Sequence, residues 1–540
     1  MLVSVGLHLG HDGGCAVLVD GQIGAALPEE RLTRQKCARG CLFSLATCLS
    51  TLGLRPADID AVVVSNSGVR LPDNPRLDPL DFLLPAGVRK HSIDHHLAHA
   101  TGAYCLSSFP RAVSVVLDSG GNDGKTSAAI EFGPDGFAYV EEPRVVPRHH
   151  SLTRTYEAFT NLFGFADHEA GKTMALAAYG DPSALGWRLF DLLPDGQVRS
   201  RLTDSHQWGA FAYLEQHGIS PSYLDPRSTL ACNIAAALQQ QFTEGLLHHL
   251  EHVGRLAPLP ICLSGGAALN CIANGHVRGM RGRTAFFMPS PGDAGLGLGN
   301  ACYGHYLLTG CFPKVADVSM RYGPKYDSRH IEAALHRDPE YTVPGFFRPA
   351  RLEHSRSSTM YQEAAAVLRR GGTVALWSGR SEYGPRALCG RSILASPRQP
   401  EMRDHLNGVK RREWFRPLAP VMSMAAAEAY FSGHSALDEL RYMVEAVTAP
   451  ETFRDSFPSA VHVDGTSRPQ VLCQSADASE PISAILAACY ERETEQVLVN
   501  TSFNIGEPIV ETPEEALATF AHSSVDLLIL DEFLVWRRAS

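Results

Sequence analysis

Long apolar runs are missing from this sequence. No stretch reaches the roughly 18 to 20 consecutive apolar residues that a membrane-spanning helix needs. The opening, MLVSVGLHLGHDGG, also lacks the basic n-region of a secretory signal. Together these absences predict a cytoplasmic protein without a membrane partner.

Paired cysteine motifs and an excess of basic residues are missing as well. The chain has 13 cysteines, an odd number, and none forms a CxxC pair, which favours reduced thiols over a disulfide framework or a thiolate zinc site. The formal net charge is −10. That balance argues against wholesale binding to nucleic acid or anionic lipid, although a local basic site remains compatible with it.

What is present indicates a folded, multidomain chain. The 540 residues exceed one ordinary core, and a composition of 44% apolar and 20% charged residues is typical of globular proteins. Between residues 311 and 356 the sequence becomes rich in Pro, Arg and Tyr with little periodicity, which is typical of a domain boundary. We therefore expect two domains, residues 1–345 and 346–540.

The first of these domains contains an internal repeat. Residues 2–31 and 111–142 each follow one plan: a strand, a glycine-rich turn, a second strand, a tight turn and a third strand. Each first turn holds an acidic residue beside glycines, where backbone N–H groups can face a phosphate. Such a duplication is typical of the actin/Hsp70-like ATPase fold with its two RNase H-like halves, and it predicts an α/β fold. Two unrelated hairpins remain the alternative.

Two further glycine-rich turns follow in the same domain. Residues 260–275, PICLSGGAALNCIANG, predict a buried strand, a Gly-Gly turn and a helix, and residues 289–301, PSPGDAGLGLGNA, again place a loop with one acid before a helix. A nucleotide phosphate can approach such a backbone closely. The residues expected to bind the nucleotide here are Ser264, Gly265, Gly266, Asn270 and Gly292.

A histidine-rich segment, DHHLAHAT at residues 94–101, is the candidate for metal binding. Residues four apart on a helix share a face, so His95 and His99 can offer nitrogens to one ion while the histidine between them points elsewhere. Acids held in glycine-rich turns, Asp118 and Asp293, are the expected oxygen ligands. This mixed set favours Fe(II), Mn(II) or Zn(II) over calcium. A surface face or hydrogen-bonded core histidines remain the alternative.

The motif GHDGG at residues 10–14 is a candidate for acid–base chemistry. His11 beside Asp12 can act as a general base near the phosphate site, because an imidazole with a pKa of about 6.5 suits that task at neutral pH. A structural histidine in a turn remains the alternative.

An arginine-rich segment distinguishes the second domain. Residues 380–416 contain nine basic residues against four acids. Interspersed Gly, Pro and Trp indicate rigid loops that aim guanidinium groups at phosphate or carboxylate oxygens. The segment lacks the aromatic interleaving that stacks bases, so an anionic small molecule fits better than nucleic acid, which remains the alternative. VNTSFN, at residues 499–504, adds amide and hydroxyl groups at a strand end, a usual place for ligand hydrogen bonds.

Taken in order, these segments resemble the O-carbamoyltransferase family of antibiotic and nodulation-factor biosynthesis. The matching motifs span residues 11–504 and are HDG, EERLTRQK, HHLAHA, GKTMALAAYG, LSGGAALN, PGDAGLGLG, EYGPRALCGRSILASP, LNGVKRREWFRPLAP and VNTSFN. Each motif is modest alone, but nine of them in register are highly specific.

The resemblance implies a two-step enzyme. Its C-terminal domain is expected to resemble the YrdC-type threonylcarbamoyl-adenylate synthases and to make carbamoyl-adenylate from carbamoyl phosphate and ATP, with Mg²⁺ accompanying the ATP. Its N-terminal domain, similar to the ATPase-fold transferase of tRNA threonylcarbamoylation, is expected to pass the carbamoyl group to a hydroxyl of a secondary metabolite or glycoside. No nucleic-acid partner is expected, and a homodimer is left open.

Residue roles carry over from the family by position. The resemblance implies Fe(II) on the four expected metal ligands, His11 with Asp12 where the acceptor reacts, and catalytic roles for Lys410 and Arg416. Carbamoyl phosphate and ATP are expected to contact Arg386, Lys410, Arg416, Arg468, Asn500 and Ser502. Cys389 stands where the family usually has glycine, so a positive φ there would strain the loop.

Two other functions remain compatible with the sequence. A tRNA-modifying enzyme of the threonylcarbamoyl type has counterparts of both domains, but the acidic net charge and the EYGPRAL and KRREWFRP motifs favour the small-molecule enzyme. A non-catalytic ATP-binding regulator explains the glycine-rich turns but leaves the histidine pair and the arginine-rich segment without a role.

Overall fold

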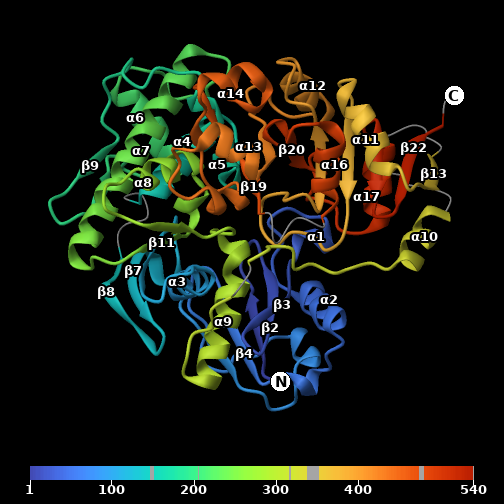
Figure 1. Cartoon of the computed structure of the whole chain (residues 1–540). Helices are drawn as coiled ribbons and strands as arrows, with labels where there is room; N and C mark the ends of the chain where they lie inside the picture. Colours follow the sequence, from blue (N-terminus) through green and yellow to red (C-terminus); the bar gives the residue numbers. More distant parts are fainter. Residues whose placement is uncertain (146–150, 205, 316–317, 337–351, 474–479, 539–540) are drawn as a thin grey trace. The chain divides into compact units, whose positions relative to one another are not determined.

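Two compact units make up the chain in this computed structural model, which describes residues 1–145, 151–204, 206–315, 318–336, 352–473 and 480–538 (Figure 1). Unit 1 comprises Met1–Glu29 and Cys37–Val318, and unit 2 comprises Glu30–Lys36 and Ser319–Ser540. The expected domain boundary after residue 345 lies outside the described residues. The segment Glu30–Lys36, called the added segment below, joins unit 2 although it lies near the start of the chain.

The first half of unit 1 is a five-stranded sheet. Its strands are β1 Val3–His8, β2 Gly14–Val19, β3 Gln22–Pro28, β4 Ala61–Ser65 and β5 Lys90–Ser92. They lie in the order β3-β2-β1-β4-β5, with β1 to β3 antiparallel and the β1–β4 and β4–β5 pairs parallel. Asp20 and Gly21 have φ of 49° and 78°, as the tight turn between β2 and β3 requires.

The second half of unit 1 repeats that arrangement. Its strands are β6 Ala112–Leu117, β7 Lys125–Gly133, β8 Gly136–Val145, β11 Ile261–Ser264 and β12 Ala285–Phe287. They lie in the order β12-β11-β6-β7-β8, with β6 to β8 antiparallel and the β6–β11 and β11–β12 pairs parallel. The repeated topology confirms the duplicated α/β fold and excludes two unrelated hairpins.

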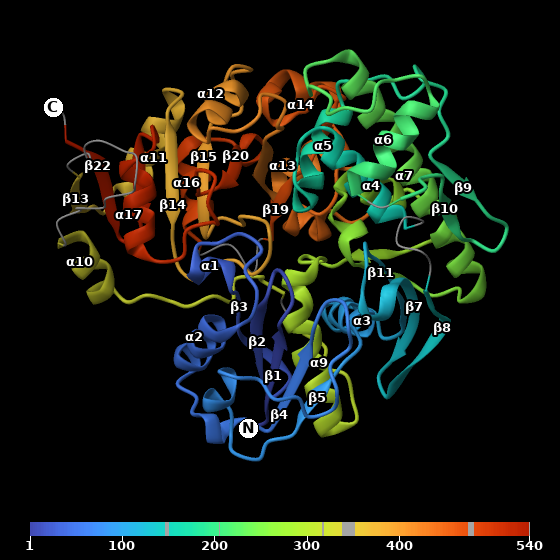
Figure 2. The same ribbon diagram turned by 180° about the vertical axis from the view of Figure 1, so that it is seen from behind.

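Helices connect these sheets (Figure 2). In unit 1 they are α2 Leu42–Leu52, α3 His95–Leu106, α4 Leu152–Leu162, α5 Ala170–Ala177, α6 His206–Gln216, α7 Thr229–Leu256, α8 Cys271–Arg278 and α9 Leu296–Thr309. A two-stranded ribbon, β9 Phe190–Leu192 with β10 Val198–Ser200, lies between α5 and α6 in sequence. Within the described ranges, no helix combines the length and the apolar character that crossing a membrane requires.

Helices α3 and α9 bring the two halves of unit 1 together. Helix α9 packs on the first sheet, α3 packs on the second, and the two helices contact each other. A Cβ atom on Gly299 would lie 1.9 Å from the carbonyl oxygen of Ala98, and Gly102 faces the same crossing. The absence of side chains lets the two backbones touch, and this crossing sets the distance between α3 and the turn that precedes α9.

Gly299→Ala is expected to lower the free energy of unfolding of unit 1 by about 2–3 kcal/mol, because α9 must move away from α3 to admit a methyl group. Urea unfolding followed by circular dichroism would measure the loss. Gly133→Ala is the control, since a Cβ atom there meets only the side chain of Arg111, at 3.8 Å. Equal stability of the two variants would contradict the close crossing.

Unit 2 is built on an eight-stranded mixed sheet. Its strands are β13 Leu352–Arg356, β14 Thr373–Trp377, β15 Arg391–Ala395, β16 Ala419–Ser423, β19 Gln470–Leu472, β20 Val497–Ser502, β21 Leu527–Leu530 and β22 Phe533–Arg537. They lie in the order β13-β22-β21-β14-β15-β20-β16-β19, with the β14–β21 and β16–β19 pairs parallel and the others antiparallel. A separate pair joins β17 Val447–Thr448 to β18 Thr466–Ser467.

Helices cover both faces of this sheet. They include α10 Ser328–His336, α11 Met360–Arg369, α12 Met402–Val409, α13 Met424–Phe431, α14 Glu451–Ser456, α16 Pro481–Cys489 and α17 Pro513–Ala521, with the short α1 Glu30–Thr33 in the added segment. Ala375 and Trp377 of β14 share a core with α10, α12 and α17, whereas Val374 and Leu376 share another with α11 and α16. Unit 2 is therefore a layered α/β fold, as expected for the second domain.

Candidate functional site

The two histidines expected to bind metal lie at the start of α3. Asp94 caps this helix by accepting hydrogen bonds from the backbone N–H groups of His96 and Leu97, at 3.0 and 3.3 Å. The helix places His95 and His99 on one face, with ring centroids 4.8 Å apart. Both side chains are 1% exposed, so their polar nitrogens need partners inside the protein.

Two carboxylates meet this histidine pair. The Nε2 atoms of His95 and His99 lie 3.4 and 3.2 Å from Asp118 Oδ2. The same two nitrogens lie 3.5 and 3.4 Å from Asp293 Oδ1. One ligand atom from each of the four residues lies within 4.8 Å of the other three. The four residues expected as metal ligands are thus brought together in one buried cluster, called the His/Asp cluster below.

The spacing of these atoms fits a divalent cation. Ligand atoms bound to one ion at about 2.1 Å lie about 3.0–3.4 Å apart when the bond angles are about 90–110°, and the four nitrogen–oxygen distances are 3.2 to 3.5 Å. Charge-assisted hydrogen bonds are shorter, at about 2.7–2.9 Å. His99 Nε2 is buried near both carboxylates without the alignment of a hydrogen bond to any described residue. Two imidazoles and two carboxylates suit Fe(II), Mn(II) or Zn(II).

Each carboxylate of the His/Asp cluster is held by its own turn. Asp118 follows β6, and its carbonyl oxygen accepts a hydrogen bond from Ser151 Oγ at 3.1 Å. Asp293 lies in the turn before α9, and its Oδ2 accepts from Ser67 Oγ at 2.9 Å. Because α9 and α3 are packed together, this turn delivers Asp293 to the start of α3.

Opposite charges stabilise one another in the His/Asp cluster. Burial alone would raise the pKa of Asp118, but the adjacent imidazoles of His95 and His99 outweigh burial and hold that pKa well below its ordinary value. Burial would likewise lower the pKa of His99, but Asp118 and Asp293 raise it to about 9. A proton on His99 therefore offsets part of the charge of the carboxylates when no cation does, and cation binding must displace that proton.

His11 and Asp12 lie at the edge of the same cluster. His11 Nδ1 is 2.9 Å from Asp12 Oδ2, and His11 Nε2 is 3.4 Å from Asp293 Oδ2. Half of the His11 side chain is exposed, so a ligand can reach it from solvent. The hydrogen bond to Asp12 is the main cause that raises the pKa of His11, to about 9, above the value assumed from the sequence. A cation bound to Asp293 would lower the pKa of His11, because it would repel the charged imidazolium.

Another histidine near Asp293, His8, was not predicted from the sequence. His8 ends β1 and is fully buried; its Nδ1 lies 2.9 Å from Ser65 Oγ and its Nε2 lies 3.6 Å from Asp293 Oδ2. Asn300 Nδ2 donates to the same Ser65 oxygen at 2.8 Å and to the carbonyl oxygen of Leu7 at 2.7 Å. His8 thus lies between Ser65, which accepts from Asn300, and the expected metal ligand Asp293. Its position at the end of a strand, directly before a glycine-rich turn, could have indicated from the sequence that it lies at the site.

The Gly-Gly turn after β11 lies against Asp118. Ser264 ends β11, and Gly265 follows with φ of 84°. A Cβ atom on Gly265 would lie 2.5 Å from the carbonyl oxygen of Leu117, and one on Gly266 would lie 3.1 Å from Asp118 Oδ1. Three of the residues expected to bind the nucleotide therefore adjoin the His/Asp cluster, with backbone close to backbone.

The other two residues of that set differ in their surroundings. Gly292 directly precedes Asp293 and so borders the cluster. Asn270 Oδ1 accepts from the backbone N–H of Ala273 at 3.0 Å and caps α8, and its amide exchanges two hydrogen bonds with Gln239, at 2.9 and 3.1 Å. The Asn270 side chain is thus occupied by structural partners, and its contact with a nucleotide stays a prediction.

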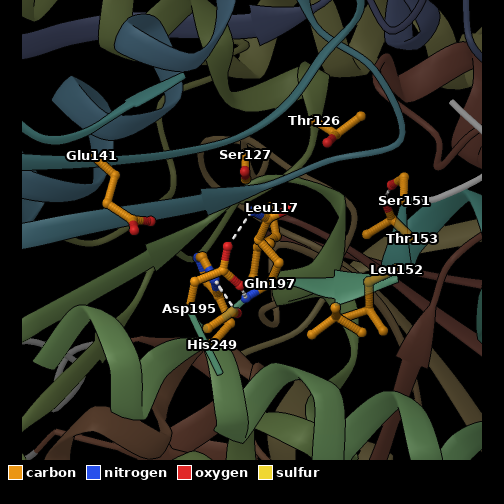
Figure 3. A pocket seen from close by; sticks show the side chains of 12 residues that line it. Leu117, Thr126, Ser127, Glu141, Ser151, Leu152, Thr153, Asp195, Gln197 and His249 are labelled. Atoms are coloured by element: carbon orange, nitrogen blue, oxygen red, sulfur yellow. Dashed lines mark hydrogen bonds between the residues drawn. The ribbon is translucent and has the colours of Figure 1, made fainter. Parts of the chain in front are cut away.

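Unit 1 also contains a small cavity that sequence reasoning missed (Figure 3). Its volume is about 60 Å³, and its lining includes Leu117, Ser127, Glu141, Ser151, Asp195 and His249. Leu117 directly precedes Asp118, and Ser151, which donates to the Asp118 carbonyl oxygen, also lines the cavity. Asp195 Oδ2 accepts from Gln197 Nε2 at 2.5 Å. A space of this size holds a few water molecules rather than a sugar.

In unit 2, Lys410 directly follows α12 and is 6% exposed. Its ammonium group contacts the carbonyl oxygen and Oγ of Ser502, the latter at 3.0 Å, and the carbonyl oxygen and Oδ1 of Asn504, at 3.0 and 2.6 Å. Burial first, and then the charges of Arg412 and Arg416, hold the pKa of Lys410 well below its ordinary value. Lys410 and Ser502, both expected in the anion site, are therefore in direct contact.

Further cations gather around Lys410. Burial and the charges of Arg416 and Arg468 lower the pKa of Arg412 to about 9. Lys36, from the added segment, also lowers the pKa of Lys410. Arg412 and Lys36 were not among the residues expected in the anion site. These five side chains, called the cationic cluster below, repel one another, and a bound anion would relieve that repulsion.

The remaining expected residues lie at the loop between β14 and β15 and at the end of β20. Arg386 lies in that loop, and its neighbour Ala387 accepts a hydrogen bond at its carbonyl oxygen from Asn500 Nδ2, at 3.0 Å. Asn500 and Ser502 both belong to β20. The strand that contacts Lys410 therefore also holds the loop that carries Arg386.

Cys389, in the same loop, has φ of 69°, the conformation that glycine adopts without strain. The positive φ that would strain the loop, now that cysteine stands in place of the family's glycine, is therefore present at Cys389. Cys389→Gly should change the free energy of unfolding by less than about 1 kcal/mol, because relief of strain offsets the lost packing of a buried thiol. Cys389→Val should cost about 2 kcal/mol or more, because β-branched residues tolerate this φ poorly. Urea unfolding measures the free energy of unfolding of both variants, and equal losses in the two would contradict backbone strain at Cys389.

Family models match both parts of the chain. Residues 88–302 match the model described as the carbamoyltransferase N-terminus, and residues 365–537 match the model described as the carbamoyltransferase C-terminus. Both models describe carbamoyltransferases, and the N-terminal model precedes the C-terminal model along this chain.

Two relatives add to this finding. Nodulation protein NolNO of Sinorhizobium fredii (strain NBRC 101917 / NGR234) is 29% identical in an alignment that covers 98% of this chain and 79% of that protein. Nodulation protein U of Azorhizobium caulinodans is 27% identical, covering 92% of each chain. HypF in its phosphate- and nucleotide-bound form superposes with a TM-score of 0.34 and 11% identity over 57% of this chain and 56% of that chain, a likeness too low to bear on function. The family expected from the nine motifs is confirmed: the chain belongs to the carbamoyltransferase family and is a transferase enzyme.

Proposed function

We propose that unit 2 makes carbamoyl-adenylate from carbamoyl phosphate and ATP, and that unit 1 transfers the carbamoyl group to a hydroxyl of a secondary metabolite or glycoside. The observation that carries this proposal is the separation of two kinds of charged cluster: cations around Lys410 in one unit, and histidines with aspartates in the other. Cations suit phosphates, and a His/Asp cluster suits a metal ion. Two different sites support two different steps.

The first step activates a weak electrophile. Nitrogen donates into the carbonyl of a carbamoyl group, so attachment to AMP is needed to supply a good leaving group. Water releases phosphate from carbamoyl phosphate and leaves carbamate; a carbamate oxygen then attacks the α-phosphorus of Mg²⁺-bound ATP, and pyrophosphate departs. Lys410, Arg416 and Arg468 neutralise the phosphates so that these anions can approach one another. Arg386 adds to that charge, and Asn500 and Ser502 offer polar groups to the carbamoyl end.

The second step passes the carbamoyl group to the acceptor. The acceptor oxygen attacks the carbamoyl carbon, the bond to the AMP oxygen breaks, and the hydroxyl proton moves to His11 Nε2. Asp12 holds the Nδ1 side of His11, and Nε2, which lies 3.4 Å from Asp293 Oδ2, accepts the proton in the neutral form of the imidazole. A divalent cation, Fe(II) in this proposal, supplies Lewis acidity for the departing phosphate when the His/Asp cluster holds it. The N–H group of Gly266 lies beside that cluster and can donate to the same phosphate.

Incubation of the purified enzyme with carbamoyl phosphate, ATP, Mg²⁺ and a panel of hydroxylated acceptors tests this proposal. Pyrophosphate should be released only when both carbamoyl phosphate and ATP are present, and mass spectrometry should find one acceptor that has gained a carbamoyl group. Binding of tRNA at physiological salt, with no carbamoyl group gained by any small acceptor, would favour the tRNA-modifying alternative.

A further inference from the structure

A buried carboxylate holds the loop that carries Arg386. Glu382 is fully buried. Its Oε1 accepts hydrogen bonds from the backbone N–H groups of Leu388, Gly390 and Arg391, at 2.7, 2.7 and 3.0 Å. Hydrogen bonds to an ionised acceptor are stronger than those between neutral groups. A single oxygen atom therefore fixes three amides of this loop, provided that Glu382 carries its charge.

Arginines balance the charge of Glu382. Burial alone would raise its pKa, but the charges of Arg31, Arg391 and Arg321 outweigh burial and keep that pKa below its ordinary value. Arg31 has the largest effect of the three, and its side chain is itself fully buried. A buried carboxylate that lost this partner would be left with uncompensated charge.

The added segment supplies Arg31 and is anchored to the same region of unit 2. Arg31 Nη2 donates to the carbonyl oxygen of Gly384 at 3.1 Å, across 353 positions of sequence. Arg34 Nη1 donates to the carbonyl oxygen of Ile509 at 2.8 Å, and its Nη2 donates to that of Pro508 at 2.7 Å. The segment therefore contacts both the start of the Arg386 loop and the chain that follows β20.

The loop is in turn connected to Lys410. Asn500 Nδ2 donates to the carbonyl oxygen of Ala387 at 3.0 Å, and Lys410 Nζ donates to Ser502 Oγ at 3.0 Å. Because Asn500 and Ser502 belong to the same strand, a displacement of the loop reaches the residues expected to hold the anion.

We infer that Arg31 and Glu382 are positioning residues for the anion site of unit 2. Arg31 neutralises Glu382, Glu382 fixes the loop, and the loop holds Arg386 and Asn500 in place. Both side chains are fully buried, so they act through the loop and not by contact with the anion. The naming of carbamoyl phosphate as the anion rests on the proposed function, whereas the positioning of the loop does not.

Full-length variants test this inference. Arg31→Met and Glu382→Gln should each raise the KM for carbamoyl phosphate in pyrophosphate release about tenfold, while kcat changes less than about threefold. Arg31→Lys, which keeps the charge, should recover part of that loss. Arg492→Met is the matched control in the same unit, since the Arg492 side chain is 81% exposed, and its KM should stay unchanged.

A double variant separates positioning from a general loss of stability. When Arg31→Met is added to Arg386→Ala, the KM should rise by clearly less than the tenfold that Arg31→Met causes alone, because one of the positioned groups is already gone. Full additivity of the two changes, or an unchanged KM in Arg31→Met, would overturn the inference. Should Arg31→Met fail to fold, Glu382→Gln keeps the shape of the side chain and must show the same rise in KM.

The wild-type enzyme distinguishes failure of this inference from failure of the proposed function. If it releases no pyrophosphate, the proposed function is wrong, and calorimetric titration with inorganic phosphate decides the inference alone. Arg31→Met should then bind phosphate about tenfold more weakly than the wild type and Arg492→Met. Equal affinities of the three proteins would overturn the inference.

Discussion

Lys410→Ala is expected to lower carbamoyl-phosphate-dependent pyrophosphate release by about 10²–10³-fold, the loss typical when a fixed charged donor to a reacting group is removed. The Lys410 ammonium group is buried within the cationic cluster and touches Ser502 and Asn504. Its removal takes away a charge that the proposed function assigns to the phosphates, and the oxygens of Ser502 and Asn504 lose the hydrogen bonds of the ammonium group. A coupled assay of the initial rate of pyrophosphate release measures the effect.

Two controls accompany this prediction. Lys325→Ala removes an exposed ammonium group from the same unit, and its rate should stay within about twofold of the wild type. Lys410→Ala should also still transfer the carbamoyl group from supplied carbamoyl-adenylate, because the proposed function assigns that step to unit 1. Full pyrophosphate release by Lys410→Ala would show that the cationic cluster does not activate the carbamoyl group.

His95→Ala combined with Asp118→Ala is expected to abolish metal binding and to lower carbamoyl transfer by more than about 10³-fold. The change removes two of the four atoms that converge in the His/Asp cluster. Elemental analysis should find less than about 0.1 ion per chain in this variant, against about one in the wild type. Pyrophosphate release should persist, because the cationic cluster lies in the other unit.

A surface variant of the same composition is the control for that result. His168→Ala combined with Asp167→Ala removes one imidazole and one carboxylate from exposed positions of unit 1. It should keep both the ion and the transfer step. A His95→Ala/Asp118→Ala protein that retains its full metal content would contradict the assignment of the four ligands.

Local patterns in the sequence were sufficient to predict the duplicated sheets and the His/Asp cluster. The residue types of Asp20 and Gly21 alone predict the tight turn between their two strands. His95 and His99 were readable as a pair because four-residue spacing on a helix is a local property. Asp118 was readable because it follows an apolar strand and begins a glycine-rich turn.

Other parts of the fold depend on contacts between distant residues. Arg31 meets Gly384 across 353 positions, and no local pattern reports such a contact; the segment EERLTRQK looks like a solvated helix start. Glu382 looked like one acid among many bases, and only its burial shows that it organises a loop. The pKa of His11 likewise depends on its bond to Asp12, which residue type alone does not reveal.

The identity of the phosphorus-containing products tests adenylate activation most directly. The wild-type enzyme, incubated with ATP, carbamoyl phosphate and Mg²⁺, can be followed by phosphorus NMR. We predict that pyrophosphate and phosphate accumulate together with carbamoyl-adenylate, or with the AMP that its hydrolysis releases, because the carbamate oxygen attacks the α-phosphorus of ATP, and that Lys410→Ala forms these products about 10²–10³-fold more slowly. Accumulation of ADP, or carbamoylated acceptor formed without any consumption of ATP, would contradict the activation of the carbamoyl group as its adenylate.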